Sequence, residues 1–491
     1  MVVVGAGNAA MCAAITAREV GKRVLVLERA PRRQRGGNSW FTDGAMRFAH
    51  NGIENVRTLL PHMRDKEADR IELPPYPESE FLSDLHRMSD GRADETLSRV
   101  LAQESFQSMA WLRDRGVLFA MLYENQSFET SGRYRFWGGL AVKVEGKGVG
   151  LIEALSRRVD ELGVEVLYDA PLINLNRVRD SWIVGVAHRG QNQSVETPAV
   201  VLACGGFQAN REMRTQYLGQ EWDGAIVRGT GHNTGVGLRI ALAQGAARHG
   251  DWSGCHAIAT DSNAPPVGDY EFPGDVFKKH SYPLGIVVNV NGVRFVDEGA
   301  DFRNYTYARY GHEVLRQPRG IAYQIFDAQV IDRLREEYRL PDATKFEADT
   351  LDQLASQLDI DAPAFLATVR QYNQAVRDDP YNPDRLDGKG TQGVTPPKTN
   401  WALRIEAPPF VAYPVRCGIT FTFGGIRINE HAQVLRDDRS IIPGLYAAGE
   451  IVGGLFYGNY PGGAGLTSGS TFGRMAGAHA SRFRERRSAD P

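Results

Sequence analysis

The sequence predicts an α/β fold in which a domain built on a parallel sheet is interrupted by an inserted α+β domain. Residues 1–28 have the order strand, glycine turn, helix, strand and acid, and a second glycine-rich region lies at 444–473. From about residue 256 the composition shifts toward Pro, Asp and aromatic residues, and the earlier type of pattern resumes near 418. We therefore expect one domain at residues 1–255 and 418–491, and a second at 256–417.

The first 28 residues predict a dinucleotide-binding unit of the Rossmann type. Val2–Val4 is an apolar strand, and the turn after it, Gly5 to Ala10, has the form G-x-G-x-x-A. Gly5 permits the turn, and Gly7 lets backbone N–H groups at the start of the helix approach a pyrophosphate. The second strand ends in Glu28, an acceptor for a ribose diol that disfavours NADP. The alternative is a glycine-containing turn in an ordinary α/β sheet.

The other end of the chain indicates which dinucleotide is bound. A strand that includes Leu445 and Tyr446 ends in Gly449-Glu450, a glycine-rich run follows at 453–469, and a helix is expected from about Ser470 to residue 484. Glycines allow the main chain to lie flat against a ring system. Two half-sites at opposite ends of one chain suit FAD, and the domain is expected to be of the glutathione-reductase type. A flexible glycine linker is the alternative, but this stretch is too apolar for one.

The elements between these two motifs follow from periodicity and turn residues. We expect mainly helix at 51–135 and in the charged stretch 327–376. The other expected elements are a helix at 148–162, a strand at 164–168, paired strands within 172–188, a buried strand at 199–207, a glycine loop at 229–237, a helix at 235–247 and a hairpin at 285–296 that turns at Asn291-Gly292.

Composition excludes several classes of protein. The chain is 42% hydrophobic and 24% charged, with a net charge of −2, so no bulk field favours nucleic acid or an anionic membrane. It contains no run of 18 apolar residues that would predict a transmembrane segment. The four isolated cysteines form no C-x-x-C motif, so we expect no iron–sulfur, zinc or c-type haem site and no other metal. With a first strand that starts at Val2 and no export signal, a cytoplasmic location is expected.

Several motifs, in this order, resemble those of a known flavoprotein family. They are Gly36-Gly37-Asn38-Ser39, Leu202 to Phe207, Asn291 to Glu298, and Gly444 to Gly473. The family includes the flavoprotein subunits of fumarate reductase and succinate dehydrogenase, flavocytochrome fumarate reductases and 3-ketosteroid dehydrogenases. Within it, the chain is most similar to the tricarballylate dehydrogenases. The resemblance implies hydride transfer between substrate carbon and flavin N5, proton transfer at the neighbouring carbon, and a capping domain that excludes water.

The resemblance and the motifs together assign the residues expected to hold FAD. Asn38 occupies the position at which succinate dehydrogenase-like members carry the histidine bonded covalently to flavin, so non-covalent FAD is expected. The full set of expected cofactor residues is Gly5, Gly7, Asn8, Ala9, Glu28, Arg29, Gly36, Gly37, Asn38, Ser39, Asp43, Gly44, Ala170, Ala203, Gly205, Gly206, Asn233, Gly235, Gly449, Glu450, Gly465, Leu466 and Thr467.

The resemblance also implies catalytic residues. In fumarate reductases the proton-transfer arginine comes shortly after an Arg-Phe-x-x-Glu segment. Here Arg303 comes five residues after Glu298 of that segment, one residue more than in the family pattern. We expect Arg303 either to move the proton or only to pair with a substrate carboxylate. Tyr305 is the second candidate. The expected catalytic set is Arg303, Tyr305, His256 and Tyr460; the expected substrate-binding set is His256, Arg303, Arg416, Phe421, Tyr460, Gly462 and Gly463.

Departures from the family pattern bear on the substrate. Phe421 and Tyr460 stand where fumarate reductases carry a carboxylate-binding histidine and arginine, and Phe277-Lys278 aligns loosely with their Thr-Glu proton relay. These differences argue against succinate and fumarate. Basic residues of the capping domain and of the nearby loop are the candidate counter-charges for carboxylates, namely Arg303, Arg416, Arg133, Arg135, Lys143 and Lys278, although ordinary surface charge explains any one of them taken alone.

Three functions follow from this reading. The leading one is an FAD-dependent dehydrogenase of a small carboxylate, with tricarballylate converted to cis-aconitate. The second is a dehydrogenase or ene-reductase of a hydrophobic cyclic ketone or a specialised metabolite, which Phe421 and Tyr460 favour. The third is a redox subunit that docks to other proteins and turns over little itself. Electrons are expected to leave to a separate acceptor, for which the family suggests a membrane-associated electron-transfer protein.

Overall fold

A six-stranded sheet forms the base of the molecule. The computed structural model describes residues 1–272 and 276–483. The sheet has the order β22-β23-β13-β1-β2-β9, and all neighbours are parallel except β22 and β23. Its strands are β1 (Val2–Val4), β2 (Leu25–Leu27), β9 (Glu165–Leu167), β13 (Val200–Leu202), β22 (Gln433–Leu435) and β23 (Ile441–Ala447). Val and Leu fill β1 and β13 because both faces of a parallel sheet are covered.

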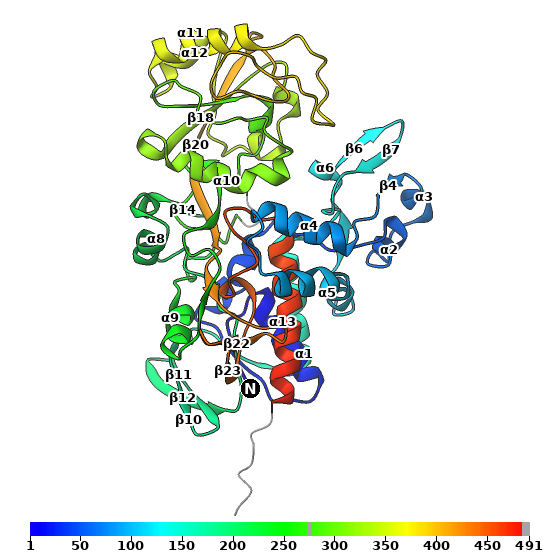
Figure 1. The fold of residues 1–491 in the computed structure, drawn as a ribbon, viewed down its shortest axis with the longest axis vertical. Coiled ribbons are helices and arrows are strands. Elements are labelled where there is room, and N and C mark those ends of the chain that lie inside the picture. Colours follow the sequence, from blue (N-terminus) through cyan, green and yellow to red (C-terminus); the bar gives the residue numbers. More distant parts are fainter. Residues whose placement is uncertain (273–275, 484–491) are drawn as a thin grey trace, which may run out of the picture.

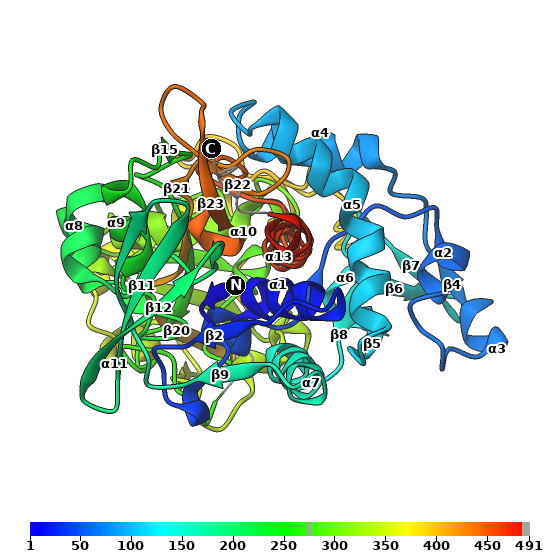
Figure 2. The same cartoon turned by 90° about the horizontal axis from the view of Figure 1, so that it is seen from below.

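Two helices lie side by side against this sheet. Figures 1 and 2 show α1 (Asn8–Glu19) next to α13 (Ala464–Arg482). A Cβ atom at Gly473 would lie 2.4 Å from the carbonyl oxygen of Ala9, and one at Gly477 would lie 2.3 Å from that of Ala13. The glycines therefore let the two backbones approach closely, and the matching order of the contacts makes the helices parallel. Both N-termini consequently lie at the same end of the pair.

A second sheet forms the upper part of the molecule in Figure 1. Its order is β14-β20-β18-β17, and β16 and β19 also pair with β20. The strands are β14 (Ile226–Val227), β16 (Cys255–Asp261), β17 (Ile286–Asn289), β18 (Ile321–Asp327), β19 (Phe346–Ala348) and β20 (Phe410–Thr422). Helix α10 (Arg303–Leu315) crosses β16 at Gly311, and α11 (Leu351–Gln357) and α12 (Ala362–Ala375) lie at the top. We call this region the cap.

The remaining elements surround the two sheets. A side lobe, drawn in blue and cyan in Figure 1, contains most of residues 45–144. It comprises β3 (Ala45–Met46), α2 (Ile53–Arg57), α3 (Asp65–Ala68), β4 (Ile71–Glu72), α4 (Glu78–Met88), α5 (Glu95–Arg113), β5 (Phe119–Met121), α6 (Tyr123–Gln126), β6 (Ser127–Thr130), β7 (Arg133–Phe136) and β8 (Val142–Val144). The others are α7 (Lys147–Glu161), β10 (Leu172–Val178), β11 (Ser181–His188), β12 (Gln191–Thr197), α8 (Arg211–Tyr217), α9 (Val236–Ala243), β15 (Arg248–His249) and β21 (Gly425–Ile426).

The α/β fold class and most elements of the cofactor region are confirmed. The domain boundaries at 255/256 and 417/418 stay predictions, and both fall within paired strands, β16 and β20. The predicted end of the last helix at residue 484 and the rest of that segment to 491 lie outside the described residues. No helix within the described residues is long and apolar enough to cross a membrane.

Three element predictions are wrong in part. The predicted hairpin at 285–296 is a turn with one bridge, Val288 to Arg294, because β17 pairs instead with β18 and Asn289 Oδ1 accepts backbone N–H groups from inside the turn. The stretch 51–135 contains strands as well as helices, and helix in 327–376 begins only at Leu351 apart from short 3-10 turns. The last helix starts at Ala464, within the run expected to lie as a loop.

Candidate active site

A long cavity runs between the sheet edge, the start of α1 and the end of β20. At one end it is lined by Glu28 and Leu172, and at the other by Phe421, Phe456 and Tyr460. Most of the expected cofactor residues line it: Gly5, Gly7, Asn8, Ala9, Glu28, Arg29, Gly36, Gly37, Asn38, Ser39, Ala203, Gly205, Asn233, Gly235, Gly449, Glu450, Gly465 and Leu466. Those that do not are Asp43, Gly44, Ala170, Gly206 and Thr467.

Glu28 is held in place by backbone donors at the first end of the cavity. Its carboxylate accepts hydrogen bonds from Ala6 N at 2.7 Å and from Ala30 N at 2.8 Å. Burial raises the pKa of Glu28, and these hydrogen bonds oppose that rise. Neighbouring Arg29 turns outward and donates to the carbonyl oxygen of His232 at 3.2 Å. Glu28 is thus a fixed acceptor at the end of β2, where a ribose diol is expected to bind.

The glycine turn before α1 fits a diphosphate. Gly5 has a φ of 108°, and a Cβ atom there would lie 2.4 Å from the carbonyl oxygen of Ala203. The N-cap of α1 is Gly7, and no side chain caps the helix or places an acid in its first turn. Asn8 N donates to Ser39 Oγ at 3.3 Å, which leaves other amides of the first turn for an anion. The cavity therefore offers the anion site that FAD requires.

Two polar side chains, Asn38 and Glu450, hold together the segments that surround the middle of the cavity. Asn38 Nδ2 donates to the carbonyl oxygen of Thr420 at 2.7 Å, and its Oδ1 accepts from Thr230 N at 3.1 Å. Glu450 accepts from Thr422 N at 3.0 Å and from Asn233 Nδ2 at 3.1 Å. Burial raises the pKa of Glu450 to about 7 despite these donors. Asn38 and Glu450 therefore join loops of the cofactor region to the end of β20.

An aromatic cluster, defined as His256, Tyr307, Phe421, Phe456 and Tyr460, lies at the other end of the cavity. Phe421, Phe456 and Tyr460 line the cavity, and His256 and Tyr307 pack against them from outside it. His256 stacks on Phe421 with ring centroids 5.3 Å apart, and Tyr460 lies edge-on to both rings. Neither ring nitrogen of His256 has a hydrogen-bond partner within the described chain. Burial lowers the pKa of His256 well below its usual value, so the imidazole is neutral. The structure thus brings three of the predicted site residues together.

Helix α10 places Arg303 and Tyr307 on the face toward this cluster. The guanidinium of Arg303 lies 5.0 Å from the centre of the Tyr307 ring, and its Nη1 lies 3.3 Å from His280 Nδ1. Arg303 forms no ion pair with an acid in residues 1–272 or 276–483, and its buried Nε has no partner there. The side-chain partner of this guanidinium in the described chain is therefore a histidine and not a carboxylate.

Tyr305 lies elsewhere, and sequence reasoning missed Tyr307. The Tyr305 ring lies under the guanidinium of Arg87, 4.1 Å from its centre, on another face of α10. Tyr307 instead reaches the cluster, and its hydroxyl donates to that of Tyr460 at 2.9 Å. The spacing of four residues from Arg303 was a usable signal, because such residues share one face of a helix.

Other predicted residues lie outside the cluster or act through backbone. Arg416 donates to the carbonyl oxygen of Gly224 at 3.3 Å, away from the cavity. The carbonyl oxygens of Gly462 and Gly463 accept from Arg47, through Nε at 2.9 Å and backbone N at 3.2 Å. Arg47 is fully buried and was not predicted. It fixes the backbone between Tyr460 and the start of α13.

Most of the candidate counter-charges have partners elsewhere. Lys143 pairs with Glu124 at 2.8 Å, and Arg133 lies 3.4 Å from Glu72 on the side lobe. Lys278 pairs with Asp43; burial favours the neutral acid, but Lys278 and Lys147 together lower the pKa of Asp43. These ion pairs explain the charges without a substrate. Arg135 is exposed on β7.

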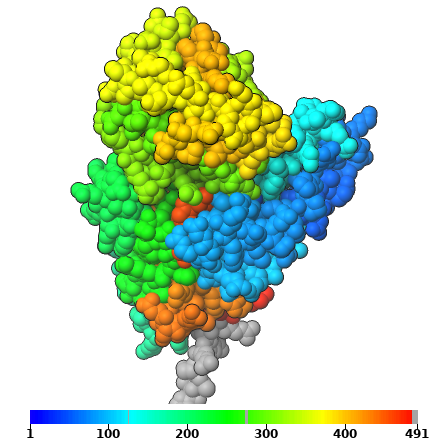
Figure 3. All heavy atoms as spheres, turned by 45° about the horizontal axis from the view of Figure 1, so that its top comes forward, coloured from blue at the N-terminus to red at the C-terminus, as the bar shows by residue number. Residues whose placement is uncertain are grey.

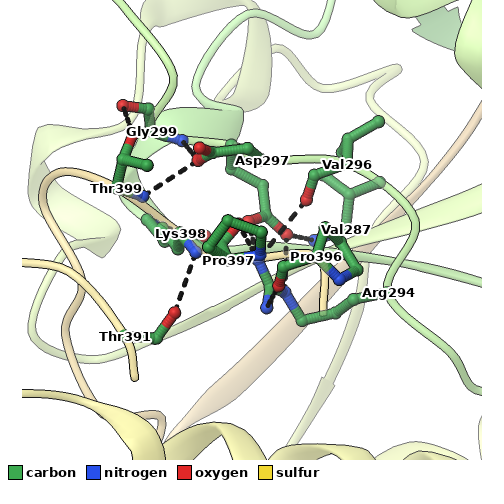
Figure 4. Close-up of polar contacts among 12 residues, drawn as sticks. Val287, Arg294, Val296, Asp297, Gly299, Thr391, Pro396, Pro397, Lys398 and Thr399 are labelled. Atoms are coloured by element: carbon green, nitrogen blue, oxygen red, sulfur yellow. Dashed lines mark hydrogen bonds and ion pairs between the residues drawn. The ribbon is translucent and has the colours of Figure 1, made fainter. Parts of the chain in front are cut away.

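The segment that leads into α10 is held by a buried ion pair between Arg294 and Glu298, and Figure 4 shows Arg294 with the labelled residues around it. Both carboxylate oxygens of Glu298 accept from Arg294, at 3.1 Å from Nε and 2.5 Å from Nη2. Glu298 also accepts from Val287 N at 2.8 Å, and Arg294 donates to the carbonyl oxygen of Pro396 at 2.9 Å. The motif that carried the resemblance therefore joins β17, the loop before α10 and the chain near Pro396. This arrangement fixes the position from which Arg303 projects.

Comparisons with known proteins agree with this geometry. The chain is 28% identical to an NADH:fumarate oxidoreductase of Klebsiella pneumoniae over 98% of this chain, and spans 47% of that relative. It is 27% identical to a 3-oxosteroid 1-dehydrogenase of Mycolicibacterium smegmatis, covering 97% of this chain and 96% of that one. A solved flavocytochrome c3 fumarate reductase in its open conformation shares the fold, with a TM-score of 0.72, 24% identity, and coverage of 98% of this chain and 78% of that one.

The family model described as "FAD binding domain" matches residues 1–466. This match includes the glycine turn, Glu28, Glu450 and the aromatic cluster. FAD is thus the cofactor, and the glycine turn and the uncapped start of α1 fit its diphosphate. The chain therefore belongs to this FAD-binding family, whose relatives are oxidoreductases of C–C bonds.

Proposed function

We propose that the chain is an FAD-dependent dehydrogenase that forms a C=C bond next to a carboxylate, with tricarballylate to cis-aconitate as the leading reaction. The observation that carries this proposal is Arg303, a half-buried guanidinium that has no acidic partner in the described chain and stands beside the aromatic cluster. A substrate carboxylate at Arg303 would supply the missing charge. The reacting carbons would then lie toward Phe421 and Tyr460, which line the FAD cavity.

Each side chain has a distinct part in this reaction. Arg303 either takes the proton released from the carbon next to the hydride donor or only binds and orients a carboxylate. Phe421 and Phe456 exclude water from the reacting carbons. Neutral His256 packs behind Phe421 and adds no charge. When bound, FAD supplies the hydride acceptor, flavin N5.

A second candidate is a dehydrogenase or ene-reductase of a hydrophobic cyclic ketone. It is favoured by the aromatic rings of Phe421, Phe456 and Tyr460 at the end of the cavity, and by the similarity to a 3-oxosteroid 1-dehydrogenase. Under this proposal Tyr460 donates to the ketone oxygen, and Arg303 serves only to position α10. A redox subunit with little turnover of its own remains the third proposal.

Anaerobic absorbance of the FAD-loaded protein tests these proposals. We expect tricarballylate to bleach the oxidised flavin band, while succinate and a 3-ketosteroid leave it unchanged. Bleaching by the steroid alone would replace the carboxylate proposal with the ketone one. An Arg303→Ala variant that retains FAD and is still bleached by tricarballylate at the normal rate would remove Arg303 from the reaction. A flavin that no compound bleaches favours the docking subunit.

The electron acceptor and the location are also proposals. The relatives include an NADH-linked fumarate oxidoreductase of about twice this length, which supports a separate electron-transfer partner for this chain. A membrane-associated acceptor is our proposal for that partner. The cytoplasmic location is supported by four cysteines that form no disulfide, three of them buried.

A further inference from the structure

A pair of tyrosine hydroxyl groups connects α10 to the FAD cavity. Tyr307 Oη and Tyr460 Oη are 2.9 Å apart, and both residues are at most 9% exposed. Tyr460 lines the cavity, whereas Tyr307 lies behind it. A Cβ atom at position 462 would lie 3.2 Å from Tyr307 Oη, so glycine at Gly462 leaves room for this hydroxyl. The two hydroxyl groups therefore join α10 of the cap to the loop before α13.

The direction of this hydrogen bond decides what each tyrosine can do. Tyr307 donates, and Tyr460 accepts. The backbone N–H of Gly463 also acts to lower the pKa of Tyr460. Because Tyr460 accepts the hydrogen bond from Tyr307, its own proton remains available for another partner. Burial raises the pKa of both phenols, but the two donors oppose that rise at Tyr460, whereas donation to Tyr460 adds to it at Tyr307. Tyr460 is thus the stronger acid of the pair.

The surroundings of Tyr307 hold its ring without using its hydroxyl. His256 and His280 lie edge-on at 5.2 and 5.1 Å, and the guanidinium of Arg303 lies 5.0 Å from the ring centre. Removal of the hydroxyl alone would therefore preserve the packing of the ring. Tyr307→Phe therefore removes the hydrogen bond to Tyr460 and keeps the ring contacts.

We propose that Tyr307 is a positioning residue that holds Tyr460 as a proton donor directed into the substrate end of the cavity. The partner of Tyr460 is then an oxygen acceptor conjugated to the reacting C–C bond, a carbonyl or a carboxylate. This inference rests on the proposed function, because it names the substrate group that Tyr460 recognises. It adds a residue that touches neither the substrate nor the cavity.

The test reads the acidity of Tyr460 directly and requires no substrate. In the FAD-loaded full chain, 3,5-difluorotyrosine is incorporated at position 460, and fluorine NMR follows its ionisation with pH. We expect Tyr307→Phe to raise the midpoint by about one pH unit, or tenfold in acidity, as loss of one donated hydrogen bond does. Tyr310→Phe is the matched control, since this buried tyrosine of α10 donates to the carbonyl oxygen of Asp297 instead, and it should leave the midpoint unchanged.

The outcomes separate this inference from the proposed function. A lower midpoint in Tyr307→Phe would show that Tyr460 donates to Tyr307, and it would overturn the proposal. An unchanged midpoint, or an equal change in Tyr310→Phe, would overturn it as well. A second measurement uses cyclohex-2-enone and fumarate as oxygen-acceptor probes: the fluorine signal should shift on addition of either. If tricarballylate fails to bleach the flavin while Tyr307→Phe still raises the midpoint, the proposed substrate fails and the role of Tyr307 stands.

Discussion

Glu450 shows how a single residue responds to the cavity it lines. Its carboxylate accepts from Thr422 and Asn233, yet burial still raises its pKa to about 7 from a usual 4.5. A raised pKa in the folded state means that this group contributes stability that is fully present below about 4.5 and lost as pH rises through about 7. The FAD-free protein should therefore become less stable across this window.

We expect Glu450→Gln to reduce this loss of stability. Between pH 4.5 and 7 the melting temperature of the FAD-free variant should fall by about 2–5 °C less than that of the natural chain. Differential scanning fluorimetry across this window measures the difference, in which groups common to both proteins cancel. Glu212→Gln, at an exposed position on α8, is the control. Parallel pH curves for the natural chain and Glu450→Gln would show that Glu450 ionises normally.

The distance along the chain between interacting residues determines which site residues can be predicted from the sequence. Glu28 and Gly5 were predictable because turn, helix and acid are close in sequence and act through backbone geometry. Arg47 was not, because its partner Gly462 lies 415 residues away. The spacing from Arg303 could place Tyr307 on the same face of α10, but not against Tyr460, which lies 153 residues further on. Arg303 and Tyr305 were both predicted as candidates, but only the start of α10 shows which of the two faces the cluster.

At the scale of elements, the contact between α1 and α13 sets the geometry of the cavity. The spacing Gly469, Gly473 and Gly477 presents glycine to α1 at every turn. From sequence, the glycines suggested a loop until about Ser470, because glycine lowers helix propensity. Close packing against Ala9 and Ala13 outweighs that cost. Tertiary contact therefore determined where α13 begins, and local propensity did not.

We expect Gly473→Ala to weaken both the fold and the binding of FAD. Its Cβ atom would lie 2.4 Å from the carbonyl oxygen of Ala9, so α13 must move away from α1. Such overpacking costs about 1–3 kcal/mol, and it displaces the start of α13 from the cavity. Thermal unfolding and reconstitution of the FAD-free protein with FAD measure the two effects. Gly224→Ala, where no atom lies within 4 Å of the new Cβ, should change neither; equal behaviour of the two variants would refute the argument.

At the scale of the molecule, the cavity passes from the base sheet to the cap. Figure 3 shows a hollow between the cap and the side lobe, with C-terminal atoms, drawn in red, at its floor. Asn38 links the cofactor region to the cap sheet, because it hydrogen-bonds both to Thr230 and to Thr420 near the end of β20. An amide used in this way has no nucleophilic nitrogen for a bond to flavin, which supports non-covalent FAD.

Acid precipitation of the purified protein tests this expectation. All of the flavin should remain in the yellow supernatant, with the chromatographic mobility of authentic FAD, and the pellet should be colourless. The same treatment of Asn38→Asp, which keeps the size of the side chain but loses the donor to Thr420, should also release FAD, after weaker binding. A yellow pellet would establish a covalent bond formed by another residue.

Strand β20 runs without interruption from Phe410 to Thr422. Its first half pairs with β18 and β19 in the cap, and its last residues carry Phe421 to the cavity and Thr422 to Glu450. A rotation of the cap must therefore drag this strand, and with it the ring that covers the reacting carbons, unless the strand bends. A cap movement that admits substrate therefore also changes the shape of the surface that binds it. A substitution that alters one of these properties should alter the other.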